Sequence, residues 1–236
     1  DGRLSVVPPS WRPDIEAEAD LVEEVLRIYG YEFIPVTPLT LDTTLPKRAL
    51  APEQERAVRA RRALAARGMT EAVTFSFLRS SEAVLFGGGQ PEMALANPIS
   101  ADLDRMRPSI LPNLVGAARR NADRGVADGV LFEVGPQYGG VAATDQRLVA
   151  AGLRWGRTGT RHWAVAPRTV DAFDAKADAM AALEAAGAPV ANLQVSTDAP
   201  AWYHPGRSGA LRLGPKVLAL FGELHPGVLA DLGYDG

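Results

Sequence analysis

Hydrophobic and polar positions follow two different periods along the chain. The helical period of 3.6 predicts four helices, which cover residues 15–29, 52–67, 109–124 and 172–186. Alternating or β-rich runs predict six strands, which cover residues 71–78, 130–138, 147–155, 190–196, 209–214 and 217–224. Several of these strands are joined by hairpin-length loops, and only some by helices. This favours an α+β fold, an antiparallel or mixed sheet flanked by helices, over a doubly wound parallel sheet.

A proline- and threonine-rich stretch, residues 35–52, interrupts this pattern. Proline cannot donate a backbone hydrogen bond, so we expect an extended linker and place a domain boundary near residue 42. The domains would then be residues 1–42 and residues 43–236. About forty residues are few for an independent core, and we expect the first domain to be part of something larger.

Composition excludes several classes of site. The 236 residues contain no cysteine, which excludes disulfides, thiol catalysis and cysteine-based zinc sites. The three histidines do not form an HExxH motif. No apolar run is long enough for a membrane-spanning helix. The net charge of −3 does not indicate a nucleic-acid-binding protein, although residues 1–40 are acidic and residues 47–67 are basic.

The predicted helix at residues 15–29 separates apolar from acidic positions. Asp20, Glu23 and Glu24 share its polar face, and Asp14 lies just before the helix, where it could cap it. Carboxylates gathered in this way stay ionised when they are solvated, paired with arginine or bridged by a hard cation such as Mg²⁺. A solvated acidic face near a helix N-terminus is the simpler alternative.

Several segments resemble a known family when read in order. These are PPSWRPDI, DLVEEV and RIYGY near the start, ANPIS and the helix that follows it, LFEVG at 131–135, WYHPGRSG at 202–209 and GELHP at 222–226. Together they are similar to the beta subunits of bacterial phenylalanyl-tRNA synthetases, across essentially the whole chain.

The resemblance implies a fold and a function. Residues 1–42 would be the C-terminal part of a small winged-helix-like domain, and residues 43–236 a domain shaped like a class II synthetase catalytic domain. The family's Mg²⁺ ligands match four residues here: Asp14, Asp20, Glu23 and Glu24. The family is cytoplasmic and assembles as two alpha and two beta subunits, and it uses ATP to attach phenylalanine to its tRNA.

The resemblance also implies that this chain has no catalytic residue of its own. The chemistry and most ATP binding belong to the alpha subunit, and the closing segment GELHPGVLADLG lacks the arginine of a GxGxxxR element. We therefore expect a structural part that supports the alpha subunit and is inactive alone. Two rival hypotheses are a stand-alone class II ligase of another kind and a nucleic-acid-binding module that uses the winged-helix-like piece.

Other conspicuous residues have simple structural interpretations. We expect Arg105 and Arg107 to be structural or interface residues. His204, near Arg207, would satisfy a turn at a strand start, and His225 would make a strand-end contact. We interpret the three glycines at 87–89 as a plain loop, because no GK[ST] follows them. The basic helix at 56–67 would face solvent or a subunit, since it lacks the interleaved aromatics typical of RNA contacts.

Overall fold

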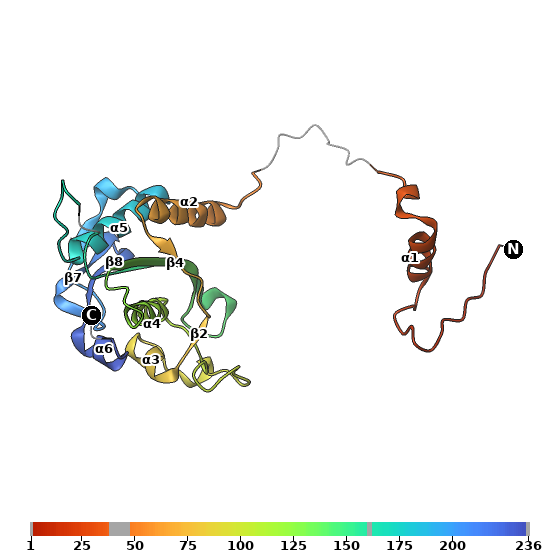
Figure 1. Ribbon diagram of the computed structural model, residues 1–236, viewed down its shortest axis with the longest axis horizontal. Coiled ribbons are helices and arrows are strands. Elements are labelled where there is room, and N and C mark those ends of the chain that lie inside the picture. The colour runs from red at the N-terminus through yellow and green to blue at the C-terminus, as the bar shows by residue number, and fades with distance from the viewer. Residues whose placement is uncertain (1, 38–47, 160–161, 235–236) are drawn as a thin grey trace. The chain divides into compact units, whose positions relative to one another are not determined.

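The computed structural model describes residues 2–37, 48–159 and 162–234 (Figure 1). The chain divides into two compact units, residues 1–48 and residues 49–236. The domain boundary predicted near residue 42 lies outside the described residues. Within those residues, no helix has the length and apolar composition needed to cross a bilayer.

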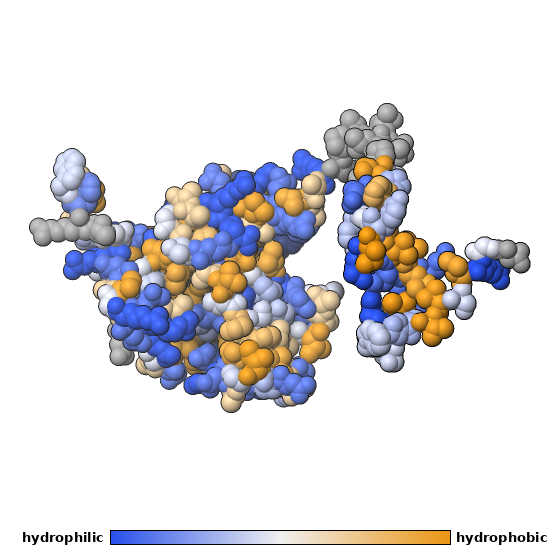
Figure 2. Space-filling view, turned by 45° about the vertical axis from the view of Figure 1, so that its right-hand side comes forward, coloured by the Kyte–Doolittle hydropathy of each residue, from blue (hydrophilic) through white to orange (hydrophobic). Residues whose placement is uncertain are grey.

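The first unit is a short helical piece. Helix α1 spans Glu18–Tyr29, and the 3₁₀ helix η1 spans Tyr31–Phe33. Gly30 ends α1 at a φ of 123°, a backbone region that favours glycine, and its N–H bonds the carbonyl of Leu26 at 2.8 Å. Helix α1 has no buried residue, and hydrophobic residues lie on the surface of this unit (Figure 2). The ring of Tyr29, in its last turn, lies 4.6 Å from that of Phe33 in η1.

The second unit contains five α-helices and eight strands among the described residues. The helices are α2 (Pro52–Ala66), α3 (Ser80–Leu85), α4 (Leu111–Ala122), α5 (Ala172–Ala185) and α6 (Pro226–Asp231). The strands are β1 (Thr70–Glu71), β2 (Phe77–Leu78), β3 (Arg105–Met106), β4 (Gly129–Tyr138), β5 (Gln146–Trp155), β6 (Gln194–Ser196), β7 (Tyr203–Leu213) and β8 (Lys216–Leu224). Single 3₁₀ turns precede β3, β5 and β6: η2 (Pro91–Met93), η3 (Ala143–Asp145) and η4 (Val190–Asn192).

The strands form three small sheets. Their orders are β1-β4-β5, β2-β3 and β6-β7-β8. All pairs are antiparallel except β1 with β4, which is parallel. The α+β class is therefore as expected, but the predicted single antiparallel or mixed sheet is replaced by three sheets.

Most elements lie where the sequence pattern places them, and three strands differ. Strand β7 begins at Tyr203, before the strand predicted at 209–214. The strand predicted at 71–78 is wrong as one element, because only β1 and β2 at its ends pair with other strands. The segment between them turns Thr74 toward buried charges on β4. The strand predicted at 190–196 is shortened to β6, because residues 190–192 form a 3₁₀ turn. The hairpin predicted at Gly214–Pro215 joins β7 to β8.

The long hairpin β4–β5 separates two layers of helices, α2 with α5 on one side and α4 on the other (Figure 1). On the first side, Leu64 and Met69 pack with Phe132, and Val130 and Val134 flank them on the same face of β4. This is the two-residue period of a strand buried on both faces. Alternate residues of β4 therefore belong to different cores.

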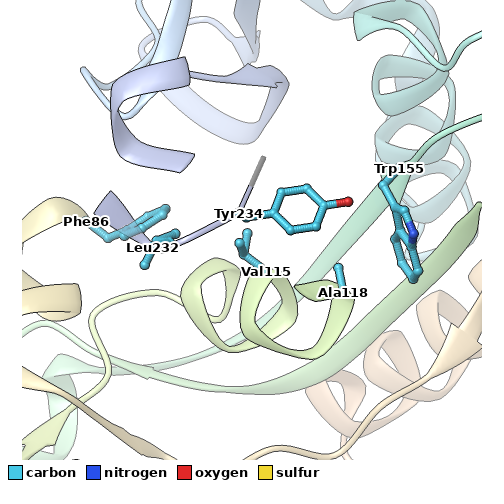
Figure 3. Close-up of a cluster of buried hydrophobic side chains, with 6 residues drawn as sticks. All are labelled: Phe86, Val115, Ala118, Trp155, Leu232 and Tyr234. Atoms are coloured by element: carbon cyan, nitrogen blue, oxygen red, sulfur yellow. The ribbon is translucent and has the colours of Figure 1, made fainter. Parts of the chain in front are cut away.

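The second core lies on the α4 side (Figure 3). Val115 and Ala118 of α4 face Trp155 of β5, together with three residues from the ends of other elements: Phe86, Leu232 and Tyr234. The indole N–H of Trp155 donates to the carbonyl of Val126 at 3.2 Å. Burial raises the pKa of the Tyr234 phenol. This core fixes α4 against the hairpin and thereby fixes the outer face of α4.

Candidate functional site

The acidic residues of the first unit have different local roles. Helix α1 begins after Ala17, not after Asp14, so the predicted cap at Asp14 is wrong. Asp20 reaches back instead, and its Oδ2 accepts from the backbone N–H groups of Glu16 at 2.9 Å and Ala17 at 2.8 Å. These two donors lower the pKa of Asp20. Asp20 thus stabilises the start of the helix.

Asp14 and Glu24 are joined by the guanidinium of Arg12. Its Nη2 lies 2.7 Å from Oδ2 of Asp14 and 2.6 Å from Oε1 of Glu24, and its Nε lies 3.0 Å from Oδ1 of Asp14. The other oxygen of Glu24 accepts from Nη2 of Arg27 at 2.7 Å. Arg12, and after it Arg27, lowers the pKa of Glu24 to about 2. Arg12 likewise lowers the pKa of Asp14, and its own pKa is raised by the two carboxylates.

The four predicted metal ligands do not converge in this arrangement. The chemistry of the set suits Mg²⁺, which prefers carboxylate oxygens. However, arginines occupy the oxygens of Asp14 and Glu24, Asp20 caps the helix, and Glu23 is exposed. Over the residues that the structure describes, no three acidic or histidine side chains are grouped as metal ligands. The arrangement therefore does not fit a bound Mg²⁺, and the assignment of these residues stays a prediction.

Sequence reasoning missed Arg12 although it considered arginine pairing for these carboxylates. Arg12 stands two residues before Asp14, which is a local signal for that pair. Its contact with Glu24 spans twelve positions and depends on the path of the chain before α1. Only the first of the two pairs could have been found from the sequence.

The second unit has a cleft between α4 and the segment that joins β1 to β2. It encloses about 480 Å³ and is bordered by α3 and residues 102–103. Two apolar residues of its rim are strongly exposed, Val73 at 91% and Phe75 at 61%. Arg79 and Asp102 form an ion pair of 2.7 Å on the same lining. The cleft thus offers an apolar rim with charged groups beside it.

A buried ion pair holds the cleft segment in place. Arg107 is 1% exposed and Glu133 4% exposed, and Nη2 of Arg107 lies 2.8 Å from Oε1 of Glu133. Nη1 of Arg107 donates to the hydroxyl of Thr74 at 2.9 Å, and that hydroxyl donates to Oε2 of Glu133 at 2.6 Å. Nε of Arg107 donates to the carbonyl of Pro136 at 2.8 Å. The network ties the segment that carries Val73 and Phe75 to β4.

The remaining candidates have the structural roles expected of them. Nδ1 of His204 accepts from the backbone N–H of Gly206 at 3.1 Å, and Nδ1 of His225 accepts from that of Gly227 at 3.1 Å. Arg105 donates to the carbonyl of Gln90 at 2.7 Å. The glycines at 87–89 form a loop after α3. Helix α2 packs on α5, and its Arg61 forms an ion pair with Glu71 of β1 at 2.5 Å.

The acidic surface of α1 and the pairing on α2 give no support to nucleic-acid binding. Glu23 of α1 is exposed, and a carboxylate at this position repels phosphate. Three arginines of the basic segment, Arg59, Arg61 and Arg67, form ion pairs with carboxylates. The alternative of a nucleic-acid-binding module is therefore not favoured.

The sequence matches known families and proteins over its whole length. The family described as phenylalanyl tRNA synthetase beta chain CLM domain matches residues 34–236, and the tRNA synthetase B5 domain matches residues 1–31. The chain is 61% identical to the phenylalanine–tRNA ligase beta subunit of Paramagnetospirillum magneticum, covering 100% of the chain and 29% of that protein. The corresponding protein of Rhodospirillum rubrum is 59% identical, with 99% and 29% covered.

The matched relatives are much longer than this chain. The chain spans about three tenths of the length of the curated relatives it matches. A solved structure of pyrrolysyl-tRNA synthetase from Desulfitobacterium hafniense is 18% identical, with a TM-score of 0.48 over 77% of this chain and 62% of that one.

Proposed function

The chain belongs to the family of the phenylalanyl tRNA synthetase beta chain CLM domain, and from this we propose that it is the part of a phenylalanine–tRNA ligase beta subunit that supports the alpha subunit. The names of its relatives, at 50–61% identity, support this proposal. The second unit would be the class II synthetase catalytic-like domain, and the first unit the end of the small domain before it. We place the enzyme in the cytoplasm.

In this proposal the chain supports the alpha subunit and does not itself catalyse the reaction. The alpha subunit would bind ATP, activate phenylalanine and transfer it to tRNA, in an assembly of two alpha and two beta subunits. Arg105 and Arg107 are the arginines considered above for binding a triphosphate, and both are already bonded within this chain. Arg107 is buried against Glu133, and Arg105 donates to the carbonyl of Gln90. The isolated chain should therefore show no phenylalanine-dependent exchange between ATP and pyrophosphate.

The observation that carries the proposal is the exposed rim of the cleft on α4. Val73 and Phe75 are exposed apolar side chains on one rim of a cleft, and apolar surface gathered beside a groove is typical of a protein–protein contact. The buried pair of Arg107 and Glu133 fixes the segment that bears them. Aromatic residues are enriched in protein–protein interfaces, and Phe75 is an exposed aromatic residue in an ordered segment.

We also propose, from the family resemblance, that Asp14, Asp20, Glu23 and Glu24 take part in a Mg²⁺ site shared with the alpha subunit. When bound, the cation would supply positive charge between the two subunits. The carboxylates of this chain would have to leave Arg12, Arg27 and the helix start in order to reach it.

The test is assembly with the alpha subunit from the same source. Light scattering of the mixture should give the mass of a complex, and we expect Phe75→Glu to weaken that complex because it places a charge on the rim. Val217→Glu is the matched control, since Val217 is another exposed apolar residue, on β8. Two separate species with the unmodified chain would contradict the proposed function. A complex equally weakened by both variants would contradict the role of the rim.

A further inference from the structure

A glycine in the middle of α4 carries an inference about the cleft, and this inference rests on the proposed function above. Gly116 lies near the centre of this 12-residue helix. Glycine is the least favourable residue in a helix interior after proline, because it loses the most conformational freedom on folding. Among the described residues, no other glycine stands in the middle of a helix. Gly116 therefore lowers the intrinsic stability of α4.

Neither the backbone nor the packing of this chain requires a glycine at position 116. Gly116 has an ordinary helical backbone and not a positive φ. Apart from the backbone of its own helix, a Cβ placed there would meet only Nη1 of Arg120, at 3.4 Å. That is an ordinary van der Waals distance to the flexible end of an exposed side chain. Alanine would therefore fit, and the glycine leaves a space that the chain itself does not use.

This space lies on the part of α4 that lines the cleft. Val115 of the same helix faces the core (Figure 3). Gly116 lines the cleft instead, with Asn113 and Arg120 about one turn before and after it. Nδ2 of Asn113 donates to the carbonyl of Phe75 at 3.2 Å. This bond joins the helix to the apolar rim, so the rim and Gly116 form one contact surface.

We infer that Gly116 seats an apolar side chain of the alpha subunit, which enters the cleft as part of a chain segment that also covers Val73 and Phe75. With no side chain at 116, the incoming group can pack directly on the backbone of α4. A neighbouring carboxylate of the same segment would pair with Arg120, which forms no ion pair with any of the described residues. A free small molecule is a poorer occupant, because its site would enclose most of its surface, whereas Val73 leaves this rim 91% exposed.

The first experiment titrates the alpha subunit from the same source with the unmodified chain, Gly116→Leu and Gly159→Leu, and follows assembly by light scattering. Leucine at 116 fills the space that the partner's side chain needs, so we expect the dissociation constant to rise about tenfold or more. Gly159→Leu is the matched control, because Gly159 lies outside the cleft and a Cβ there would meet nothing within 4 Å. Its dissociation constant should equal that of the unmodified chain.

The outcomes separate the inference from the proposed function. If Gly116→Leu binds as tightly as the unmodified chain, or if Gly159→Leu loses as much affinity, the inference is overturned and the proposed function stands. If the unmodified chain forms no complex, both are overturned.

Gly116→Ala distinguishes an effect on binding from an effect on folding. Its urea midpoint should lie above that of the unmodified chain, because alanine favours a helix, while its dissociation constant should rise, though less than that of Gly116→Leu. A lower urea midpoint would show that the packing of the chain itself requires the glycine, and this would overturn the inference.

A thiol at the rim tests whether the partner enters the cleft. The chain has no cysteine, so Val73→Cys introduces a single reactive group whose alkylation by iodoacetamide can be followed by the mass of this chain. An excess of the alpha subunit should slow this reaction, because access to the thiol controls its rate. Val217→Cys, on β8 outside the cleft, is the control and should keep its rate. An unchanged rate for Val73→Cys in the complex would contradict the inference.

Discussion

The buried ion pair of Arg107 and Glu133 gives the strongest prediction about stability. Replacing Glu133 with glutamine keeps the size of the side chain but removes the charge opposite a guanidinium that is 1% exposed. Removing one partner of a buried pair costs about 3–5 kcal/mol, because the remaining charge stays in a poorly solvating place. We therefore expect Glu133→Gln to lower the free energy of unfolding of the second unit by about 3–5 kcal/mol.

The assay is urea unfolding followed by tryptophan fluorescence, to which Trp155, buried in the core on the α4 side, contributes. At a slope of about 2 kcal/mol per molar urea, the expected loss moves the midpoint down by about 2 M. Arg79→Met is the matched control, since it breaks the surface pair with Asp102, whose side chains are 54% and 68% exposed. It should cost no more than about 1 kcal/mol. A loss below about 1.5 kcal/mol for Glu133→Gln would refute the reasoning.

Two further predictions concern carboxylates that join elements of the second unit. Asp178 of α5 binds Arg67 and Arg154, both at 2.5 Å. Asp178→Asn should therefore lower the free energy of unfolding by about 2–3 kcal/mol in the same urea assay. An unchanged free energy of unfolding would contradict this prediction. The hydroxyl and N–H of Ser80 lower the pKa of Asp104, so its stabilising contribution is complete above about pH 4 and is lost as the pH falls through the lowered pKa. In Asp104→Asn, the urea midpoint should fall less steeply as the pH is lowered below about 4. An unchanged dependence on pH would show that other groups determine the loss of stability in acid.

The sequence predicts elements well where local chemistry decides them. Helix α2 begins at Pro52 and ends before Gly68, and α5 begins after the capping side chain of Asp171. The hairpin of β7 and β8 turns at Gly214 with a φ of 57°. In each case a residue with a strong intrinsic preference stands at the boundary, so the position of the boundary can be read without knowledge of the tertiary contacts.

The sequence predicts strand boundaries less well where contacts between distant residues determine them. The run at 71–78 alternates like one strand, yet its middle is held by Thr74 against Arg107 and Glu133, more than thirty residues away. Strand β7 begins at Tyr203 and not at residue 209, with an irregular register up to Ser208 where it passes Pro205 and Gly206. Proline and glycine interrupt the ladder at this point, and pairing with β8 resumes at Ser208.

The arginines show why residue type alone does not reveal function. Arg12 and Arg107 each contact a carboxylate at a hydrogen-bond distance, and both belong to motifs that resemble a synthetase. Arg107 is enclosed by four bonding groups and cannot reach a ligand without unfolding its surroundings, so its charge serves the shape of the cleft rim. Arg12 makes comparably short contacts in a more exposed place, with its side chain 31% exposed. Burial, and not the identity of the side chain, therefore decides which of the two charges is held in place.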